Sequence, residues 1–350
     1  MNALQSPGNN NLPSVAVVIL NWNGKDFLKK FLPSVMASTY GNLRIIVADN
    51  ASTDDSVDFL KMYFPTTEII VNEKNEGFAN GYNVPLKKIE ADYFVLLNSD
   101  VEVTPGWIEP VIELMEKDSS IAACQPKILD EKRRTHFEYA GACGGWIDAL
   151  GYPFARGRVL EKTEADTGLY DDAVPCFWAS GAAMFVKAPV FKALGGFDAH
   201  FFAHQEEIDL CWRMQLSGHR VFIQPASVVY HVGGGTLPKA NNQKTFLNFR
   251  NNLIMIYKNS SAAELLYIIP ARFFLDGLAA VKGLAWGNVG YCLAVLRAQL
   301  HFVKWMLFGR KQPVAVSRKN KKLQGVYKGS ILWQYYMNRK NTFSEIVQSK

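Results

Sequence analysis

The stretch VAVVILNWNG, residues 15–24, decides the fold class, because six apolar residues run without interruption into a polar turn. An apolar run that does not alternate is typical of a parallel strand buried on both faces of its sheet. Three similar runs follow, and helical patterns separate them: LRIIVAD (43–49), TEIIVN (67–72) and YFVLLN (93–98). This strand–helix alternation predicts a doubly wound α/β sheet.

Polar residues rich in Asn and Asp follow each of these four predicted strands. In doubly wound sheets, functional residues gather at the carboxyl ends of the strands. One polar strand end is ordinary turn chemistry, but four that behave alike indicate the rim of a ligand site. The candidate ligand-binding residues are Asn21, Asn23, Asp49, Asn50, Ser52, Asn75, Gly77, Asn83, Asn98 and Ser99.

The segment LLNSDVEV, residues 96–103, places Asp100 at the end of a buried strand. A carboxylate in that position is costly unless something satisfies it, and a divalent cation bound to a diphosphate would do so. Glu102 either points the same way or faces solvent. His231 follows the apolar run 227–230 and precedes three glycines, so it is either a structural histidine or a second metal ligand.

The densest cluster of acids lies in GGFDAHFFAHQEEIDLCWR, residues 195–213. On a helix, Glu206 and Asp209 share a face and Glu207 points elsewhere. The surrounding apolar side chains predict partial burial, and a partly desolvated carboxylate with a raised pKa is a competent general base near neutral pH. The residue pattern leaves the choice among these three acids open.

Composition and charge indicate the cellular compartment in which we expect the protein to work. The 350-residue chain has a net charge of +6, but residues 301–350 hold eleven Lys or Arg against the single acid Glu345. Such a tail is either a solvated terminus or a binding segment for anionic lipid. The five cysteines form no CxxC pair, so we expect a reducing compartment. No signal peptide pattern is visible in residues 1–13, and together these features predict a cytoplasmic protein.

After residue 260 the sequence pattern changes to long helical stretches rich in aromatic residues. We therefore predict an N-terminal tail (1–13), a catalytic domain (14–260) and a C-terminal helical region with a basic tail (261–350). The longest charge-free run there, 283–296, is shorter than the roughly 20 residues that span a bilayer. An apolar helical face lies beside Arg297, His301 and Lys304 and comprises Leu293, Leu296, Leu300, Val303 and Leu307. It predicts an interfacial helix; the alternative is packing against the catalytic domain or a second subunit.

In this order, the motifs resemble those of family 2 glycosyltransferases with the GT-A fold, a mixed sheet flanked by helices. The likeness covers roughly residues 14–255 and is strongest to rhamnosyltransferase-like members that build bacterial surface polysaccharides. DNAST (49–53) resembles the nucleotide-binding motif, and Asn98-Ser99-Asp100 a degenerate Asp-x-Asp metal motif. Residues Trp178 through Ala182, which include Gly181, resemble the family's acceptor-side motif. Glu207 stands where the family usually has its Asp base, and the His-x-x-Gly element resembles residues 231–234.

The resemblance implies an inverting, metal-dependent enzyme in bacterial surface polysaccharide synthesis. Glu207 would deprotonate the acceptor hydroxyl, and Asp100 and His231 would hold Mg²⁺ or Mn²⁺. The implied donor is deoxythymidine diphosphate rhamnose, or next a uridine diphosphate sugar. The implied acceptor is a glycan or a polyprenyl-linked glycan, which fits a peripheral protein at the inner face of the cytoplasmic membrane. No nucleic acid is expected, and a homo-oligomer is left open.

Other classes fit the residues less well. A dinucleotide-dependent oxidoreductase should show GxGxxG after its first strand, where this chain has NWNG (21–24). A sugar nucleotidyltransferase would need a glycine-rich basic loop at the same place. A hydrolase would release free sugar instead of transferring it. The remaining alternative is a non-catalytic, membrane-associated scaffold with a degenerate transferase domain, which would have lost Asp100 or the acids at 206–209.

Overall fold

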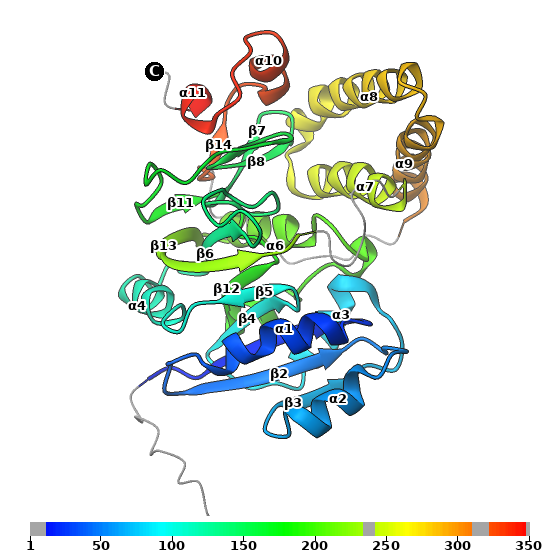
Figure 1. Cartoon of the computed structure of the whole chain (residues 1–350). Helices are drawn as coiled ribbons and strands as arrows, with labels where there is room; N and C mark the ends of the chain where they lie inside the picture. Colours follow the sequence, from blue (N-terminus) through cyan, green and yellow to red (C-terminus); the bar gives the residue numbers. More distant parts are fainter. Residues whose placement is uncertain (1–11, 234–241, 310–321, 348–350) are drawn as a thin grey trace, which may run out of the picture.

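The computed structural model describes residues 12–233, 242–309 and 322–347 (Figure 1). Four parallel strands form one half of the main sheet: β1 (Val15–Asn21), β2 (Leu43–Asp49), β3 (Glu68–Val71) and β4 (Tyr93–Asn98). The helices between them are α1 (Lys25–Met36), α2 (Ser56–Tyr63) and α3 (Gly77–Leu86). The predicted strand–helix alternation is therefore confirmed.

The other half of the sheet is mixed and supplies the second wall of the site. Its strands are β5 (Val101–Val103), β6 (Ile121–Asp130), β11 (Val174–Cys176), β12 (Ala183–Lys187) and β13 (Arg220–His231). The order across the sheet is β11-β13-β6-β12-β4-β1-β2-β3, and β5 pairs with β13. Because β12 runs antiparallel to both β4 and β6, the sheet is mixed, as expected. The intervening helices are α4 (Glu109–Lys117), α5 (Ala188–Ala193), η1 (Ala199–Phe201) and α6 (Glu206–Leu216).

The sheet is buried on both faces. Ala16 and Val18 of β1 belong to one apolar cluster, whereas Val15, Val17 and Ile19 belong to the cluster on the opposite face. Successive side chains of a strand point to opposite faces, so a strand covered on both sides must be apolar at every position. This explains why the first apolar run does not alternate.

The C-terminal tail returns to the body of the molecule. A small sheet of β7 (Gly145–Asp148), β8 (Pro153–Ala155), β9 (Arg158–Val159) and β10 (Lys162–Thr163) pairs at its edge with β14 (Val326–Tyr327). Two short helices follow, α10 (Ile331–Tyr336) and α11 (Phe343–Val347). Phe343 packs edge-on against Trp146, with 5.2 Å between the ring centroids. The expectation of a solvated tail is thus wrong for residues 322–347, because aromatic packing holds them.

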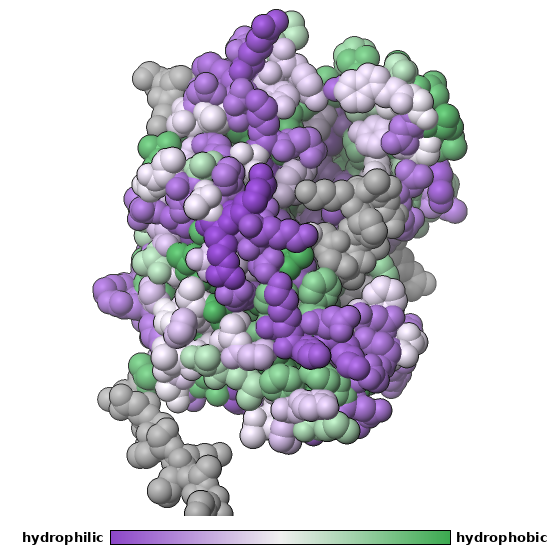
Figure 2. All heavy atoms as spheres, viewed as in Figure 1, coloured by the Kyte–Doolittle hydropathy of each residue, from purple (hydrophilic) through white to green (hydrophobic). Residues whose placement is uncertain are grey.

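Three long helices stand beside the small sheet: α7 (Asn242–Asn259), α8 (Ala262–Ala285) and α9 (Val289–Phe308). Ser261 and Glu264 form a capping box that starts α8. The division placed after residue 260 falls in the loop between α7 and α8 and stays a prediction. Within the described ranges, no helix combines the length and hydrophobicity needed to cross a membrane. Figure 2 shows hydrophobic residues exposed at the upper right of the view, over α8 and α9.

Candidate active site

Asp49 organises the turn at the carboxyl end of β2. Its carboxylate accepts hydrogen bonds from the Ser52 amide (2.8 Å), the Ser52 hydroxyl (2.7 Å) and the Asn21 amide group (2.9 Å). Asn23 joins the same turn, because its backbone N–H donates to the Ser52 hydroxyl at 2.9 Å. A carboxylate can accept about four hydrogen bonds, so Asp49 keeps capacity for a ligand hydroxyl. The structure thus brings these four predicted residues together.

A second polar network joins β2 to the start of α3. The Asn50 side-chain amide donates to the carbonyl of Gly77 (2.9 Å) and to Asn75 (3.1 Å). Gly77 has φ +71°, and a Cβ at that position would lie 2.6 Å from the backbone oxygen of Phe202. Only glycine fits both this conformation and this close approach. The loop after β3 is therefore packed directly on the segment that precedes the acidic cluster.

Asn83 serves a different part of the fold from the one predicted. Its side-chain amide donates to the Phe197 carbonyl (2.8 Å) and its oxygen accepts from the Phe197 N–H (3.0 Å). Both ends of the amide thus hold the backbone that leads to the acidic cluster. In this structure Asn83 is a positioning residue, and direct contact with a nucleotide stays a prediction.

Asp100 and His231 meet although 131 residues separate them. β5 pairs with β13 in a register that places Val101 opposite His231, and this brings Asp100 Oδ1 within 3.1 Å of His231 Nε2. The other ring nitrogen lies 3.3 Å from the carboxylate of Glu138. Burial of the ring opposes its protonation, but without a metal the charges of Glu138 and Asp100 outweigh burial and raise the pKa of His231 to about 10. A cation would therefore have to displace the proton from Nε2 in order to bind there.

This donor set fits a divalent cation. Neighbouring ligands of an octahedral Mg²⁺ at 2.0–2.1 Å are about 3 Å apart, which is close to the separation between Asp100 Oδ1 and His231 Nε2. Metal-binding histidines usually direct their other nitrogen at a carboxylate; Glu138 lies 3.3 Å from His231 Nδ1 as an ion-pair contact, although the two form no hydrogen bond in the described structure. No group of three or more His, Cys, Asp or Glu suited to a metal occurs among the described residues. The pair would therefore need substrate oxygens to complete the shell.

Of the residues predicted near Asp100 and His231, some contact this pair and others bond elsewhere. Asn98 approaches His231, with 3.5 Å between its amide nitrogen and Nε2, and Ser99 links Asn98 to Asp100 along the chain. Glu102 instead receives a 2.6 Å hydrogen bond from Arg134, so its carboxylate is already engaged in an ion pair. The part of the glycine element formed by residues 234 and 235 lies outside the described residues.

Glu206 and Glu207 begin α6 with carboxylates in a poorly solvated environment. Each has an oxygen that is shielded from solvent and has no hydrogen-bond partner in the described structure. Burial raises the pKa of Glu207 to about 7, although backbone hydrogen bonds act in the opposite direction. Burial and then the charge of Glu207 raise the pKa of Glu206 well above its usual value. Near neutral pH, Glu207 is the acid of this pair that can ionise and accept a proton.

Asp209 is a structural carboxylate. It is 0% exposed and accepts hydrogen bonds from Arg213 (2.8 Å) and Asn259 (2.8 Å), with Lys258 at 3.1 Å. Burial would raise its pKa, but the charges of Arg213 and Lys258 lower the pKa below its usual value. Its oxygens are already occupied by α6 and α7, so the structure argues against Asp209 as the base.

The acceptor-side motif links the base to the metal pair. A Cβ at Gly181 would lie 3.9 Å from the Cβ of Glu207, and the carbonyl of Ala182 accepts a 3.0 Å hydrogen bond from the Asn98 backbone N–H. Trp178 is only 2% exposed, and its indole N–H donates to the Trp146 carbonyl at 3.0 Å. Trp178 thus supports the motif from within the fold, while Gly181 lies at the site.

Residues that sequence reasoning missed hold the segment before Glu206. Phe202, His204 and Gln205 all have positive φ, between 64° and 75°, which is uncommon and strained for residues other than glycine. The side-chain amide of Asn251 in α7 donates to the carbonyls of residues 201, 203 and 204, at 2.8–2.9 Å. Asn252 bonds the Gln205 side chain at 3.2 Å. An Asn side chain within a predicted helix is usually taken for a surface residue, so no sequence signal indicated that Asn251 and Asn252 hold this segment.

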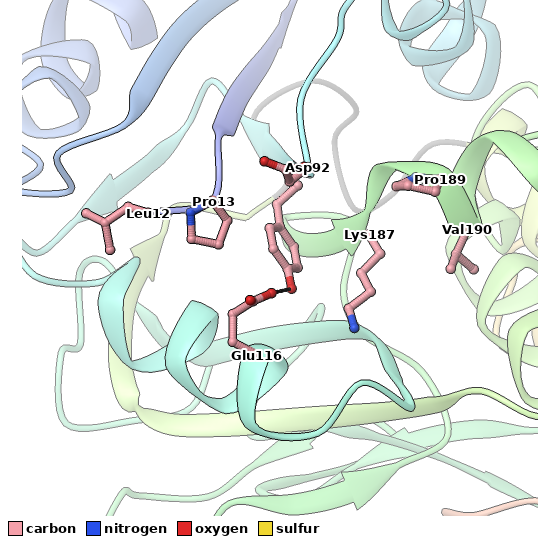
Figure 3. Close-up of a pocket in the computed structure, with 8 residues that line it drawn as sticks. Leu12, Pro13, Asp92, Glu116, Lys187, Pro189 and Val190 are labelled. Atoms are coloured by element: carbon pink, nitrogen blue, oxygen red, sulfur yellow. Dashed lines mark hydrogen bonds between the residues drawn. The ribbon is translucent and has the colours of Figure 1, made fainter. Parts of the chain in front are cut away.

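One pocket of the structure lies away from all these residues. It is lined by Asp92, Tyr93 and Glu116 among others (Figure 3), and Tyr93 begins β4, whereas Asn98 ends it. The pocket therefore lies at the amino-terminal end of strand β4, whereas the candidate site lies at its carboxyl end.

Comparisons with known proteins agree with this geometry. Residues 16–178 match the family described as "Glycosyl transferase family 2". An N-acetylglucosaminyl-diphospho-decaprenol L-rhamnosyltransferase of Mycobacterium tuberculosis is 23% identical over 63% of this chain and 76% of the relative. Rhamnosyltransferase WbbL of Escherichia coli is 26% identical over 62% of this chain and 83% of the relative.

Two solved structures share the fold. GalNAc-T7 with UDP, GalNAc and Mn²⁺ superposes with a TM-score of 0.56 at 17% identity, over 71% of this chain and 48% of its own, so the chain spans about half of it. Mannosyltransferase PcManGT of Pyrobaculum calidifontis, in complex with GDP-Man and Mn²⁺, superposes with a TM-score of 0.51 at 13% identity, over 88% of this chain and 84% of its own. Residues 16–178 thus carry a glycosyltransferase family 2 domain, and the two solved structures share the GT-A fold of this chain.

Proposed function

We propose that this glycosyltransferase transfers its sugar with inversion, in a metal-dependent reaction that uses Glu207 as the base. One observation carries the proposal: the segment Gly181–Ala182 lies between a carboxylate of near-neutral pKa and a candidate cation pair. Glu207 adjoins Gly181, the next residue bonds Asn98, and Asn98 approaches His231 beside Asp100. Single-displacement transfer needs a base on one side of the donor sugar and stabilisation of the leaving group on the other.

Each acid of α6 then has a separate task. Ionised Glu207 accepts the proton of the acceptor hydroxyl, whose oxygen attacks the anomeric carbon while the bond to the nucleoside diphosphate breaks. Burial and the charge of Glu207 raise the pKa of Glu206 above its usual value, so Glu206 favours the neutral form more than Glu207 does. Asp209 ties α6 to α7 through Asn259 and Lys258 and orients the helix.

The cation would be held by Asp100 and His231, with Glu138 orienting the imidazole. When bound, a divalent cation neutralises charge that develops on the departing diphosphate. Both structures compared above contain Mn²⁺, which supports a cation without choosing between Mg²⁺ and Mn²⁺. The turn around Asp49 and Asn23 would receive the nucleoside, because it offers acceptor and amide groups at the carboxyl edge of the sheet.

The two relatives named as rhamnosyltransferases support deoxythymidine diphosphate rhamnose as the first donor to test, ahead of uridine diphosphate sugars. The name of the mycobacterial relative contains a decaprenol diphosphate acceptor, which supports a polyprenyl-linked glycan as the acceptor here. Bacterial polysaccharide synthesis at the cytoplasmic side of a membrane is part of the same proposal.

The test is a donor panel assayed with a polyprenyl-diphosphate-linked glycan, with Mg²⁺, with Mn²⁺ and with a chelator. Nucleoside diphosphate and glycosylated product are both measured. We expect Glu207→Gln and Asp100→Ala to abolish product formation, whereas Glu113→Gln, an exposed change on α4, should leave it intact. Full turnover in Glu207→Gln would place the base elsewhere. Free sugar without product would indicate a hydrolase, and no reaction with any donor would favour the scaffold.

A further inference from the structure

The helix α8 turns a pair of charged residues, Arg272 and Asp276, toward the protein. Its buried positions are Ile268, Arg272, Asp276 and Ala280. Arg272 and Asp276 form an ion pair at 3.3 Å, and Asp276 also accepts a 2.9 Å hydrogen bond from Tyr152 of the small sheet. Arg272 further donates to the carbonyl of Leu150 at 3.2 Å. The polar stripe of α8 is thus fully used inside the fold.

The opposite face of α8 is apolar and exposed. It carries Leu266, Tyr267, Phe274, Leu278, Val281 and Leu284, which are 50–80% exposed. A surface helix of a soluble protein normally shows the reverse arrangement, with its apolar stripe buried and its charges outside. Since water would favour the usual orientation, the inverted helix indicates that a nonaqueous environment covers this face.

The next helix continues the same surface. Six large apolar residues of α9 are exposed: Val289, Leu293, Leu296, Leu300, Leu307 and Phe308. Trp286, 77% exposed, lies in the turn between the helices. Of the 25 large apolar residues exposed in the described structure, 13 thus lie between positions 266 and 308. A patch of this kind marks an interaction site.

Most charges exposed on these two helices are positive. Lys282, Arg297 and Lys304 are exposed on α8 and α9. Of the two acids on these helices, Asp276 is buried, and Glu264 is exposed at the start of α8, where it forms the capping box with Ser261. Arg297 and Lys304 lie one helical turn or less from exposed leucines, so their long side chains can reach a charged layer while the leucines enter an apolar one. Aromatic residues such as Trp286 favour the same boundary. The surface complements an anionic bilayer in both its apolar and its charged parts.

We propose that the exposed face of α8 and α9, from Leu266 to Phe308, docks on the interfacial layer of an anionic membrane. The helices lie in the plane of the head groups, and neither crosses the bilayer. This inference goes beyond the transfer reaction and stands without it, because it rests on the exposed face alone. It would bring the enzyme to a lipid-linked acceptor.

The experiment is flotation of the full chain with vesicles of pure phosphatidylcholine and with vesicles of phosphatidylcholine mixed equally with phosphatidylglycerol. We expect binding to the anionic vesicles and much weaker binding to the neutral ones. The double variant Phe274→Glu, Leu300→Glu should lose at least about tenfold in affinity, because charged side chains enter the apolar layer unfavourably. Met62→Glu, at a 71% exposed position on α2, is the matched control and should bind like the unaltered chain.

Thermal melting checks that both variants fold, and sedimentation gives their mass. Equal binding of the double variant and the unaltered chain would overturn the proposal, as would no binding of the unaltered chain. A dimer that the double variant splits, with no vesicle binding by either, would assign the face to a second copy. Because vesicle binding is measured without donor or acceptor, its outcome is separate from that of the transfer assay.

Discussion

Asn251 is a sensitive test of how α7 supports the catalytic segment. Its side-chain amide has two hydrogens and serves three carbonyl oxygens, those of residues 201, 203 and 204. Asn251→Ala would take the partner from the oxygens of residues 203 and 204, whereas that of Phe201 still accepts from Arg250 and from the Ala203 N–H. At about 1–3 kcal/mol for each buried group left unsatisfied, the free energy of unfolding should fall by about 2–6 kcal/mol.

The same change should lower turnover. Phe202, His204 and Gln205 hold positive φ angles, and each such conformation costs of order 1–3 kcal/mol unless its surroundings enforce it. Without Asn251 the segment should relax and displace Glu206 and the base that follows it. A displacement of about 1 Å can reduce the rate about 100-fold, so we expect kcat to fall more than KM changes.

Urea unfolding and steady-state kinetics measure the two effects. Asn248→Ala is the control, because Asn248 lies one turn earlier on α7 and bonds the Lys244 carbonyl of its own helix. That variant should keep both stability and kcat. If Asn251→Ala kept its kcat while losing stability, the amide would support the fold without positioning the base, and the reasoning would be refuted.

Three further predictions concern the base, the loop after β3 and the cation pair. Because a general base acts only when ionised and the pKa of Glu207 is raised to about 7, turnover should rise with pH through about 7 and level off above it; a flat profile across that range would exclude Glu207. Gly77→Ala should lower the melting temperature, since its Cβ would lie 2.6 Å from a backbone oxygen at φ +71°, whereas Gly106→Ala, with 3.9 Å of clearance, should not; equal melting would refute this. Glu138→Gln should weaken Mn²⁺ binding about 10–100-fold by loosening His231, as measured by calorimetry; unchanged affinity would show that Glu138 does not orient the ring.

The local sequence was enough to predict the parallel half of the sheet and the rim of the site. Burial on both faces demands apolar residues at every strand position, and the change from apolar run to Asn or Asp marks where each strand ends. For this reason β1, β2 and β4 (Val15–Asn21, Leu43–Asp49 and Tyr93–Asn98) match their predicted ranges closely. Glu207 was also identified, although only as one of three acids.

The tertiary structure decided what each polar group is free to do. Asp209 and Glu207 look equivalent on a helix, but Lys258 and Asn259, about 50 residues away in the chain, occupy Asp209 and leave Glu207 desolvated. Glu138 had no motif, because its role exists only where the β5–β13 pairing brings Asp100 to His231. The orientation of α8 likewise could not be predicted, because it depends on the residues that pack against its buried face. Periodicity locates an apolar stripe, but only the packing of Arg272 and Asp276 against the small sheet shows which stripe is left outside.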